Sequence, residues 1–397
     1  MISKFKWKLS MESIHTINEE FERLDLSSSK ITVMPEEIKY LIKLRRLHLS
    51  NNYITVILKE IKNLICLELL NLSNNYITVL PKEIKYCCRL YTLDLSNNNI
   101  TVIPKEIKYC CQLYTLDLSN NNITVIPKEI KYLTHLGHLN VSNNNLTVMP
   151  KEIKHCCKIY SLNLSYNNIN VLPKEIKYLI RLWTLNVSNN NITVLPKEIN
   201  YLTNLSILDL KNNNITILPK EIKYLFLNYL DCSNNNIKVL PKEIKYLILL
   251  HTLILNNNNI TVLPKEIKEC QLKILDLSNN NITVFPNEIK YLTKLHQLNL
   301  SDNSLTALPK EIKYIRKSES FEPLKILNLS NNHITVMPKE IKYLYRLWTL
   351  NLSNNHIKVL PKEIKYLTGL KLNLRNNNIL ITPKMKPFLI CDEIIKN

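Results

Sequence analysis

One asparagine returns along the chain at intervals that are mostly 23 residues and in three cases 22 residues. Self-similarity at a fixed period of roughly 20 to 50 residues is typical of repeat architectures. A weaker first copy carries Ser29 at the same place, which makes 16 repeats, and the longer step from Asn303 to Asn332 adds six residues to one of them. The repeated asparagines are Asn52, Asn75, Asn98, Asn121, Asn144, Asn167, Asn190, Asn213, Asn235, Asn258, Asn280, Asn303, Asn332, Asn355 and Asn377.

Each repeat contains two short segments with different hydrophobic periods. The alternation of Leu93 and Leu95 predicts a short strand that points both leucines inward. Ile107 and Cys110 follow Pro104 at a spacing of three, which predicts a helical or 3₁₀ segment on the opposite wall. One unit cannot bury its apolar face alone, whereas stacked units form a continuous core. The sequence therefore predicts an α/β solenoid with a concave parallel β-sheet, short helical or 3₁₀ segments on the convex side and about 16 repeats.

The repeated asparagine also has a physical explanation. A buried side-chain amide needs hydrogen-bond partners, and an identical neighbouring repeat supplies the same partners each time. We therefore expect these asparagines to form a structural ladder that bonds the backbone of adjacent turns.

These residues follow the pattern L-x-x-L-x-L-x-x-N-x-I/L, so roughly residues 21–383 resemble the leucine-rich repeat family. The Leu-Pro-x-Glu-Ile phrase is similar to its 23-residue intracellular, Ras-suppressor-like class. The resemblance implies a curved solenoid with a protein-recognition role. The chain departs from that class where it reads Ile-Lys-Tyr-Leu instead of Ile-Gly-Asn-Leu, and where Leu58 replaces the usual proline.

The two ends of the repeat array need covers, because an open solenoid exposes its core there. We expect an N-terminal cap at residues 1–22, a solenoid at residues 23–383 and a C-terminal cap at residues 384–397. The six extra residues fall within residues 315–323, where charges, serines and a proline predict a surface loop.

The composition excludes several classes of protein. Gly137 and Gly369 are the two glycines, so the glycine-rich loops that bind nucleotide phosphates cannot form. No run approaches the roughly 18 apolar residues of a membrane span, and the N-terminus does not resemble a signal peptide. We therefore expect an intracellular, cytoplasmic protein that is monomeric. The abundance of Lys, Asn, Ile and Tyr is also what an AT-rich genome produces, which suggests a large DNA virus or a protist as the source.

The sequence contains no arrangement of residues that predicts a cofactor site, a metal site or an active site. Three of the ten cysteines, Cys87, Cys110 and Cys156, take a core leucine position, so we expect reduced, apolar cysteines. Stacking leaves a bridge between Cys88 and Cys111 open as an alternative. We expect His333 and His356 to be neighbours but not a metal site, and the carboxylate pairs Asp94–Asp117 and Asp209–Asp231 to lack a positioned substrate. These observations predict a protein that is not an enzyme.

Two surfaces are candidates for binding. On the rim of the concave side, Tyr91, Tyr114, Tyr160 and Trp183 occupy one column, which Gly137 interrupts as a gap. Tyrosine and tryptophan favour interface hot spots, although the rings could instead pack on each other and shield the core. Asp94 and Asp117 add to this candidate partner-binding surface on the concave face, and we expect Leu69 and Tyr229 to extend the aromatic patch.

The second surface is convex. One column contains Lys39, Lys62, Lys85, Lys108, Lys131, Lys154 and Lys177, and the column beside it contains mainly tyrosines. A basic stripe interleaved with aromatics can bind a nucleic-acid backbone, whereas the alternative is a solvated face with Lys–Tyr contacts between repeats. We predict a non-enzymatic leucine-rich-repeat scaffold that binds a protein through its concave face and rim. The alternative function is binding of a polyanion or nucleic acid by the Lys–Tyr columns.

Overall fold

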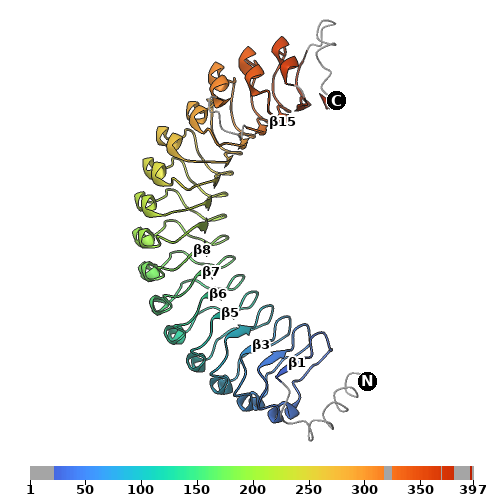
Figure 1. Ribbon diagram of the computed structural model, residues 1–397, viewed down its shortest axis with the longest axis vertical. Coiled ribbons are helices and arrows are strands. Elements are labelled where there is room, and N and C mark those ends of the chain that lie inside the picture. Colours follow the sequence, from blue (N-terminus) through green and yellow to red (C-terminus); the bar gives the residue numbers. More distant parts are fainter. Residues whose placement is uncertain (1–21, 317–323, 368, 380–393, 396–397) are drawn as a thin grey trace. The chain divides into compact units, whose positions relative to one another are not determined.

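The computed structural model describes residues 22–316, 324–367, 369–379 and 394–395 (Figure 1). The chain divides into two compact units. The first comprises Met1–Ile192 with Tyr201–Leu205, and the second comprises Thr193–Asn200 with Ser206–Asn397. The predicted caps fall mostly outside the described residues, as do residues 317–323 of the predicted insertion, so both stay predictions.

In each unit, short strands alternate with short 3₁₀ helices. The strands of the first unit are β1 (Arg23–Asp25), β2 (Arg46–His48), β3 (Leu69–Asn71), β4 (Thr92–Asp94), β5 (Thr115–Asp117), β6 (His138–Asn140), β7 (Ser161–Asn163) and β8 (Thr184–Asn186). Its helices are η1 (Glu36–Tyr40), η2 (Lys59–Asn63), η3 (Lys82–Tyr86), η4 (Lys105–Tyr109), η5 (Lys128–Tyr132), η6 (Lys151–His155) and η7 (Lys174–Tyr178).

The second unit repeats this order, and η8 (Lys197–Tyr201) has residues in both units. Its strands are β9 (Ile207–Asp209), β10 (Tyr229–Asp231), β11 (Thr252–Ile254), β12 (Ile274–Asp276), β13 (Gln297–Asn299), β14 (Ile326–Asn328), β15 (Thr349–Asn351), β16 (Lys371–Asn373) and β17 (Ile394–Ile395). Its helices are η9 (Lys220–Tyr224), η10 (Lys242–Tyr246), η11 (Lys265–Glu269), η12 (Asn287–Tyr291), η13 (Lys310–Arg316), η14 (Lys339–Leu344) and η15 (Lys362–Tyr366).

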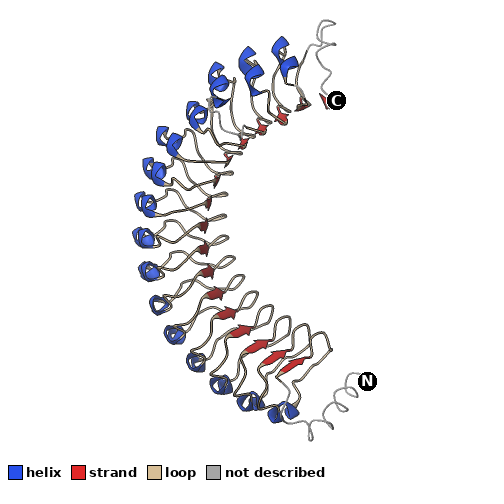
Figure 2. Ribbon diagram, viewed as in Figure 1, coloured by secondary structure: helices blue, strands red, loops and turns tan. Residues whose placement is uncertain are grey.

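Successive strands pair in parallel, from β1 to β8 in the first unit and from β9 to β17 in the second. The register sets each central leucine beside the next, as Leu93 beside Leu116. In both units the strands line one side and the 3₁₀ helices the other (Figure 2). We call these sides the strand face and the 3₁₀ face. The predicted α/β repeat solenoid is therefore confirmed.

The core lies between the two faces and contains the residues that the periodicity predicts. Leu93, Leu95 and Ile107 are at most 1% exposed, and Cys110 is fully buried. Every described 3₁₀ helix except η2 begins after a proline whose carbonyl accepts the first internal hydrogen bond, as Ile107 N donates to Pro104 O over 3.1 Å. Proline suits this position because the N–H that it lacks would have no helical partner there. Leu58 supports η2 with a similar backbone conformation, so this departure does not disturb the repeat.

The repeated asparagines join consecutive turns. Asn98 Nδ2 donates to the carbonyls of Leu72, Leu95 and Ser96 at 3.0, 3.0 and 3.1 Å, while its Oδ1 accepts from Ile77 N at 2.9 Å. One side chain therefore satisfies four hydrogen bonds, two of them in the preceding repeat, at a buried position. The Oδ1 bond to the preceding repeat recurs at Asn52, Asn75, Asn121, Asn144, Asn167, Asn190, Asn235, Asn258, Asn280, Asn303, Asn332, Asn355 and Asn377.

The residue before each of these asparagines turns the chain with a left-handed backbone. Asn97 has φ 54°, and nearly every repeat places an asparagine here. Asparagine tolerates this region better than most side chains, which explains the repeated Asn-Asn pair. Among the described residues, no helix is long and apolar enough to cross a membrane.

Candidate functional site

A column of side chains lies at the edge of the strand face in the first unit, one residue before each strand. We call it the edge column. The backbone holds it in line, because the edge residue of one repeat donates to that of the preceding repeat, as Tyr114 N to Tyr91 O at 2.9 Å. The edge column contains Glu22, Arg45, Glu68, Tyr91, Tyr114, Gly137, Tyr160 and Trp183.

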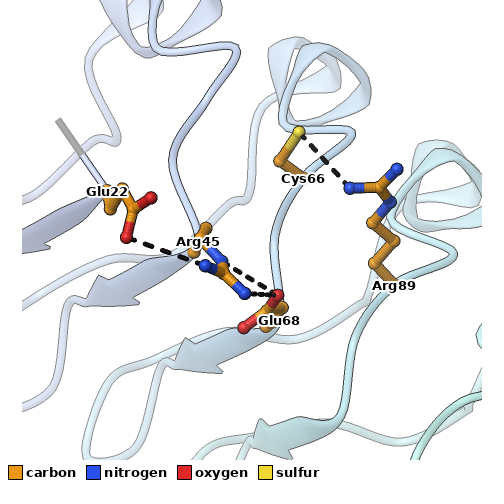
Figure 3. Close-up of polar contacts among 5 residues, drawn as sticks. All are labelled: Glu22, Arg45, Cys66, Glu68 and Arg89. Atoms are coloured by element: carbon orange, nitrogen blue, oxygen red, sulfur yellow. Dashed lines mark hydrogen bonds and ion pairs between the residues drawn. The ribbon is translucent and has the colours of Figure 1, made fainter. Parts of the chain in front are cut away.

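The first part of the edge column is charged (Figure 3). Arg45 Nη2 lies 2.6 Å from Glu68 Oε1, and Arg45 Nη1 lies 3.8 Å from Glu22 Oε2. The hydrogen bond to Glu68 raises the pKa of Arg45 further above its ordinary value. Beside this group, Arg89 Nη1 lies 3.9 Å from Cys66 Sγ. All these pairs are solvent exposed, so they contribute little to stability.

The second part of the edge column is aromatic. Tyr91 and Tyr114 stack with ring centroids 5.1 Å apart and planes 10° from parallel. Tyr160 and Trp183 stack at 6.1 Å and 5°. His138, the first residue of β6, lies edge-on between the two stacks, 5.2 Å from Tyr114 and 6.1 Å from Tyr160. We call these five rings the aromatic ladder.

The predicted gap at Gly137 does not exist. A Cβ atom on Gly137 would overlap the Tyr114 ring, which shows that this ring lies over the glycine. The imidazole of His138 continues the row toward Tyr160. Sequence reasoning missed His138 because it belongs to the strand and not to the edge column. The glycine beside it was the available signal, since a glycine often marks the close approach of another group.

The stacked rings stay partly open to solvent. Tyr91, Tyr160 and Trp183 are 51%, 44% and 41% exposed. The two interpretations of this column therefore do not exclude each other, because the rings pack on one another and still present a surface.

Two carboxylates lie on the strand face next to the aromatic ladder. Asp94 and Asp117 end β4 and β5 and are partners in register. Each Oδ1 accepts from the backbone N–H and the hydroxyl of the serine two residues later, Ser96 and Ser119. Asp117 Oδ2 also accepts from Asn140 Nδ2 at 3.1 Å. These bonds fix both side chains with the second oxygen turned away from the turn.

Leu69 and Tyr229, which were expected to extend the patch, are the first residues of their strands and not edge residues, so this extension stays a prediction. Trp348 does occupy an edge position, before β15 in the second unit. Its ring lies 4.5 Å from Lys325 Nζ and is 60% exposed.

On the 3₁₀ face, five of the seven lysines of the basic column lie over the tyrosine that follows them in the chain, whereas Lys62 is followed by Asn63 and Lys154 by His155. Nζ is 5.0 Å from the ring centroid in both Lys85–Tyr86 and Lys108–Tyr109. The expectation that such contacts join neighbouring repeats is wrong for most pairs, although Lys177 lies 5.9 Å from Tyr201 of the next repeat. In the described part of the first unit, no lysine forms an ion pair.

The cysteine pairs divide between core and surface. Cys87, Cys110 and Cys156 are buried, and burial raises the pKa of Cys87 and Cys156 to about 12. Their partners, such as Cys88 and Cys111, are exposed. The nine cysteines of the described residues are free thiols.

The histidines predicted to be neighbours are so. His333 and His356 stack at 5.5 Å in the second unit. Within the described ranges, no three histidine, cysteine, aspartate or glutamate side chains are placed to hold a metal ion.

Comparison with known proteins identifies the family. The leucine rich repeat models match residues 19–77, 42–100, 88–146, 111–169, 248–305 and 322–379, and also 181–202, 204–225 and 226–247. The chain therefore belongs to the leucine-rich repeat family. Its assignment to the Ras-suppressor-like class stays a prediction.

Solved structures share the fold along the chain. A leucine-rich-repeat protein of Leptospira interrogans is 37% identical, with 97% of this chain and 98% of that one covered and a TM-score of 0.87. The plant peptide hormone receptor RGFR1, solved in complex with RGF2, is 32% identical, with 88% and 57% covered and a TM-score of 0.75. A TDR receptor is 25% identical, with 96% and 67% covered and a TM-score of 0.77. No curated protein sequence matches the chain.

Proposed function

We propose that this protein is a non-enzymatic scaffold that binds a protein partner through the strand face and edge column of its first unit. The observation that carries the proposal is the aromatic ladder, whose rings are organised by stacking while three of them, Tyr91, Tyr160 and Trp183, remain two-fifths to half exposed. Tyrosine and tryptophan bury large areas on binding at a small cost in side-chain entropy, and rings that are already stacked lose still less.

Trp183 is the expected anchor of the interface. It ends the aromatic ladder, so one face of its indole is not covered by Tyr160. The leucine-rich-repeat fold typically supports binding and not catalysis, and the plant receptor described above was solved with its peptide partner RGF2. Both points support a protein ligand.

The test compares two tryptophans at equivalent edge positions. Trp183→Ala should cost about 2 kcal/mol or more of binding, or roughly 30-fold in affinity. Trp348→Ala in the second unit is the matched control and should leave the affinity unchanged. Binding is measured by quantitative affinity purification from cells of the source organism, with the identified partner then titrated in solution. If the Tyr160→Ala/Trp183→Ala double variant keeps the native affinity, the proposal is wrong.

A second candidate function is the binding of nucleic acid by the 3₁₀ face. It is favoured by Lys85, Lys108 and Lys131 of the basic column, which lie over tyrosine rings and take part in none of the ion pairs among the described residues. Such binding would release counterions, so labelled RNA should bind more weakly as the salt concentration rises. Replacing Lys85, Lys108 and Lys131 with glutamine should reduce the salt slope. An affinity that does not change with salt contradicts this function.

An intracellular location and a monomeric state complete the proposal. Fractionation of the source cells tests the first, and light scattering of the purified chain tests the second.

A further inference from the structure

We propose that the surface formed by Tyr91, Tyr114, Asp94 and Asp117 binds an arginine side chain of the protein partner. This inference rests on the proposed function, because it specifies the chemistry of the partner at one end of the aromatic ladder. We call the four residues the Tyr–Asp patch.

The Tyr–Asp patch lies on two adjacent strands. Tyr91 and Asp94 belong to the repeat of β4, and Tyr114 and Asp117 occupy the same places in the repeat of β5. The strands are in register, so the two carboxylates are neighbours at a strand spacing of about 4.8 Å. Each aspartate is the third residue after its tyrosine, which corresponds to roughly 10 Å of strand. A long side chain can therefore contact the rings and the carboxylates together.

The two tyrosine rings of the patch offer contact area to a partner side chain, and the two carboxylates make the patch negatively charged. Asp94 and Asp117 take part in none of the ion pairs among the described residues. No hydrogen bond of the described residues involves Asp94 Oδ2, whereas both Oδ1 atoms accept from serines and Asp117 Oδ2 accepts from the uncharged Asn140. The chain as a whole carries a formal charge of +19, so this is a local negative surface on a basic protein. A cationic group of the partner is the complement of that charge.

Arginine fits the Tyr–Asp patch better than lysine. Its planar guanidinium presents several N–H donors in a fork, so it can bond carboxylate oxygens of both strands at once. The same plane stacks on aromatic rings, and its weaker hydration lowers the cost of leaving water. Lysine offers one compact and strongly hydrated charge. Thr92 and Thr115, which lie between the tyrosines and the aspartates on the two strands, are short enough to leave room for an alkyl stem.

Neighbouring repeats lack this combination. Tyr160 and Trp183 precede strands that end in Asn163 and Asn186, so their repeats carry rings without the charge. In the second unit, Asp276 ends β12 with Ile254 and Asn299 as its register partners, so its carboxylate is single.

The test uses the full chain and a short synthetic peptide of alternating glycine and arginine, with fluorescence anisotropy as the readout. The matched probes replace every arginine with citrulline, which keeps the shape but loses the charge, or with lysine. We expect the arginine peptide to bind about tenfold more tightly than the citrulline peptide, with the lysine peptide between them. The net positive charge of the protein opposes this result, so a preference for arginine reports a local acidic site.

The variant Asp94→Asn/Asp117→Asn should abolish the preference for arginine. Asn140 and Asn163 already occupy the same strand position and accept from their serines in the same way, so the substitution preserves the turn. Asp276→Asn is the matched control and should keep the full preference. Tyr91→Ala/Tyr114→Ala should weaken the arginine peptide several-fold.

Equal binding of the arginine and citrulline peptides to the unaltered protein, including no binding of either, overturns the inference without any variant. Loss of the preference in Asp276→Asn, or its persistence in Asp94→Asn/Asp117→Asn, also overturns it. The proposed function is decided separately, by the effect of Trp183→Ala on the native partner. A scaffold that depends on Trp183 but does not distinguish arginine from citrulline would keep the first proposal and reject the second.

Discussion

The molecule contains two acidic pairs of the same design, and in only one of them does a tyrosine of the same strand bond a carboxylate. Asp94–Asp117 in the first unit and Asp209–Asp231 in the second are each placed in register on adjacent parallel strands. In the second pair, the Tyr229 hydroxyl donates to Asp231 Oδ2 at 3.3 Å, and Asp231 is only 8% exposed. In the first pair, both aspartates are half-buried and the tyrosines lie at the edge column.

The difference comes from a shift of one residue. Tyr91 and Tyr114 precede their strands, where their rings stack along the edge, whereas Tyr229 begins its strand and lies on the same face as its aspartate. Burial, together with Asp231 and Asp209, raises the pKa of Tyr229 to about 12. The position of a ring relative to the strand thus decides whether its hydroxyl bonds the carboxylate of the same strand.

The two acidic pairs differ in side chains that vary from repeat to repeat, whereas the buried asparagines are the same in both units. The asparagines should therefore stabilise both units equally. Asn167→Ala and Asn235→Ala each remove a buried side chain that makes four hydrogen bonds. Each should destabilise the protein by about 1–3 kcal/mol because backbone groups lose their partners. Denaturant unfolding measures the cost. A denaturation midpoint equal to that of the unaltered protein for either variant would show that the repeated asparagines do not stabilise that unit.

A smaller loss is expected when the aromatic ladder of the first unit is interrupted. Gly137→Ala introduces a Cβ where the Tyr114 ring lies, so the ring must move and the aromatic ladder is interrupted. We expect affinity for the partner to fall about fivefold, or roughly 1 kcal/mol. Titration of the partner measures it. Gly369→Ala is the contrasting control, because nothing lies near its Cβ but its φ is +73°. It should lower stability through backbone strain and leave partner affinity unchanged.

A smaller effect on peptide binding is expected when the tyrosine that bonds Asp231 is removed. Tyr229→Thr gives β10 the residue that begins β4 and β5, and exposes Asp231 Oδ2. In the Asp94→Asn/Asp117→Asn background, this change should restore a preference for the arginine peptide of about threefold, since exposed charge pairs contribute little. The anisotropy assay described above measures it. A citrulline peptide that gains as much as the arginine peptide would mean that exposed area, and not charge, is responsible.

The smallest expected effect concerns pH. Because the folded-state pKa of Tyr229 lies near 12 and its ordinary value is 10.0, the native protein holds this proton to higher pH than the unfolded chain. Its contribution to stability is therefore complete below pH 10 and is lost as pH rises toward 12. The difference in ultraviolet absorbance between the unaltered protein and Tyr229→Phe reports the midpoint. Asp231→Asn should move that midpoint down, and an unchanged midpoint would assign the shift to burial alone.

The sequence predicts the framework well because its residues repeat. Leu93, Leu95 and Ile107 each have an equivalent in nearly every turn, so period and stacking alone place them in the core. The same reasoning predicts that a repeated asparagine needs repeated partners.

The candidate surface is harder to predict because it depends on how one side chain leans over the next repeat. The column pattern places Gly137 as a gap, but the Tyr114 ring crosses to the following turn and meets His138 there. The lysines show the reverse case, since Lys108 turns to the tyrosine beside it in the chain and not to the next repeat. Spacing fixes which residues share a column, whereas the direction of a long side chain depends on the space around it.

The side-chain hydrogen bonds that join a repeated asparagine to another repeat all run in one direction, back to the repeat before. The Asn98 side chain bonds the backbone of Leu72 and Ile77, and the Asn121 side chain bonds the backbone of Leu95 and Ile100. Each repeat therefore carries one asparagine that bonds the preceding repeat and one set of backbone groups that the following asparagine bonds. An in-frame duplication of one repeat would add both the asparagine and the backbone groups that the next asparagine bonds, so it would leave no buried polar group unsatisfied. The array can therefore lengthen or shorten by whole turns during evolution, while a change of a fraction of a turn would have to leave the stack as a loop.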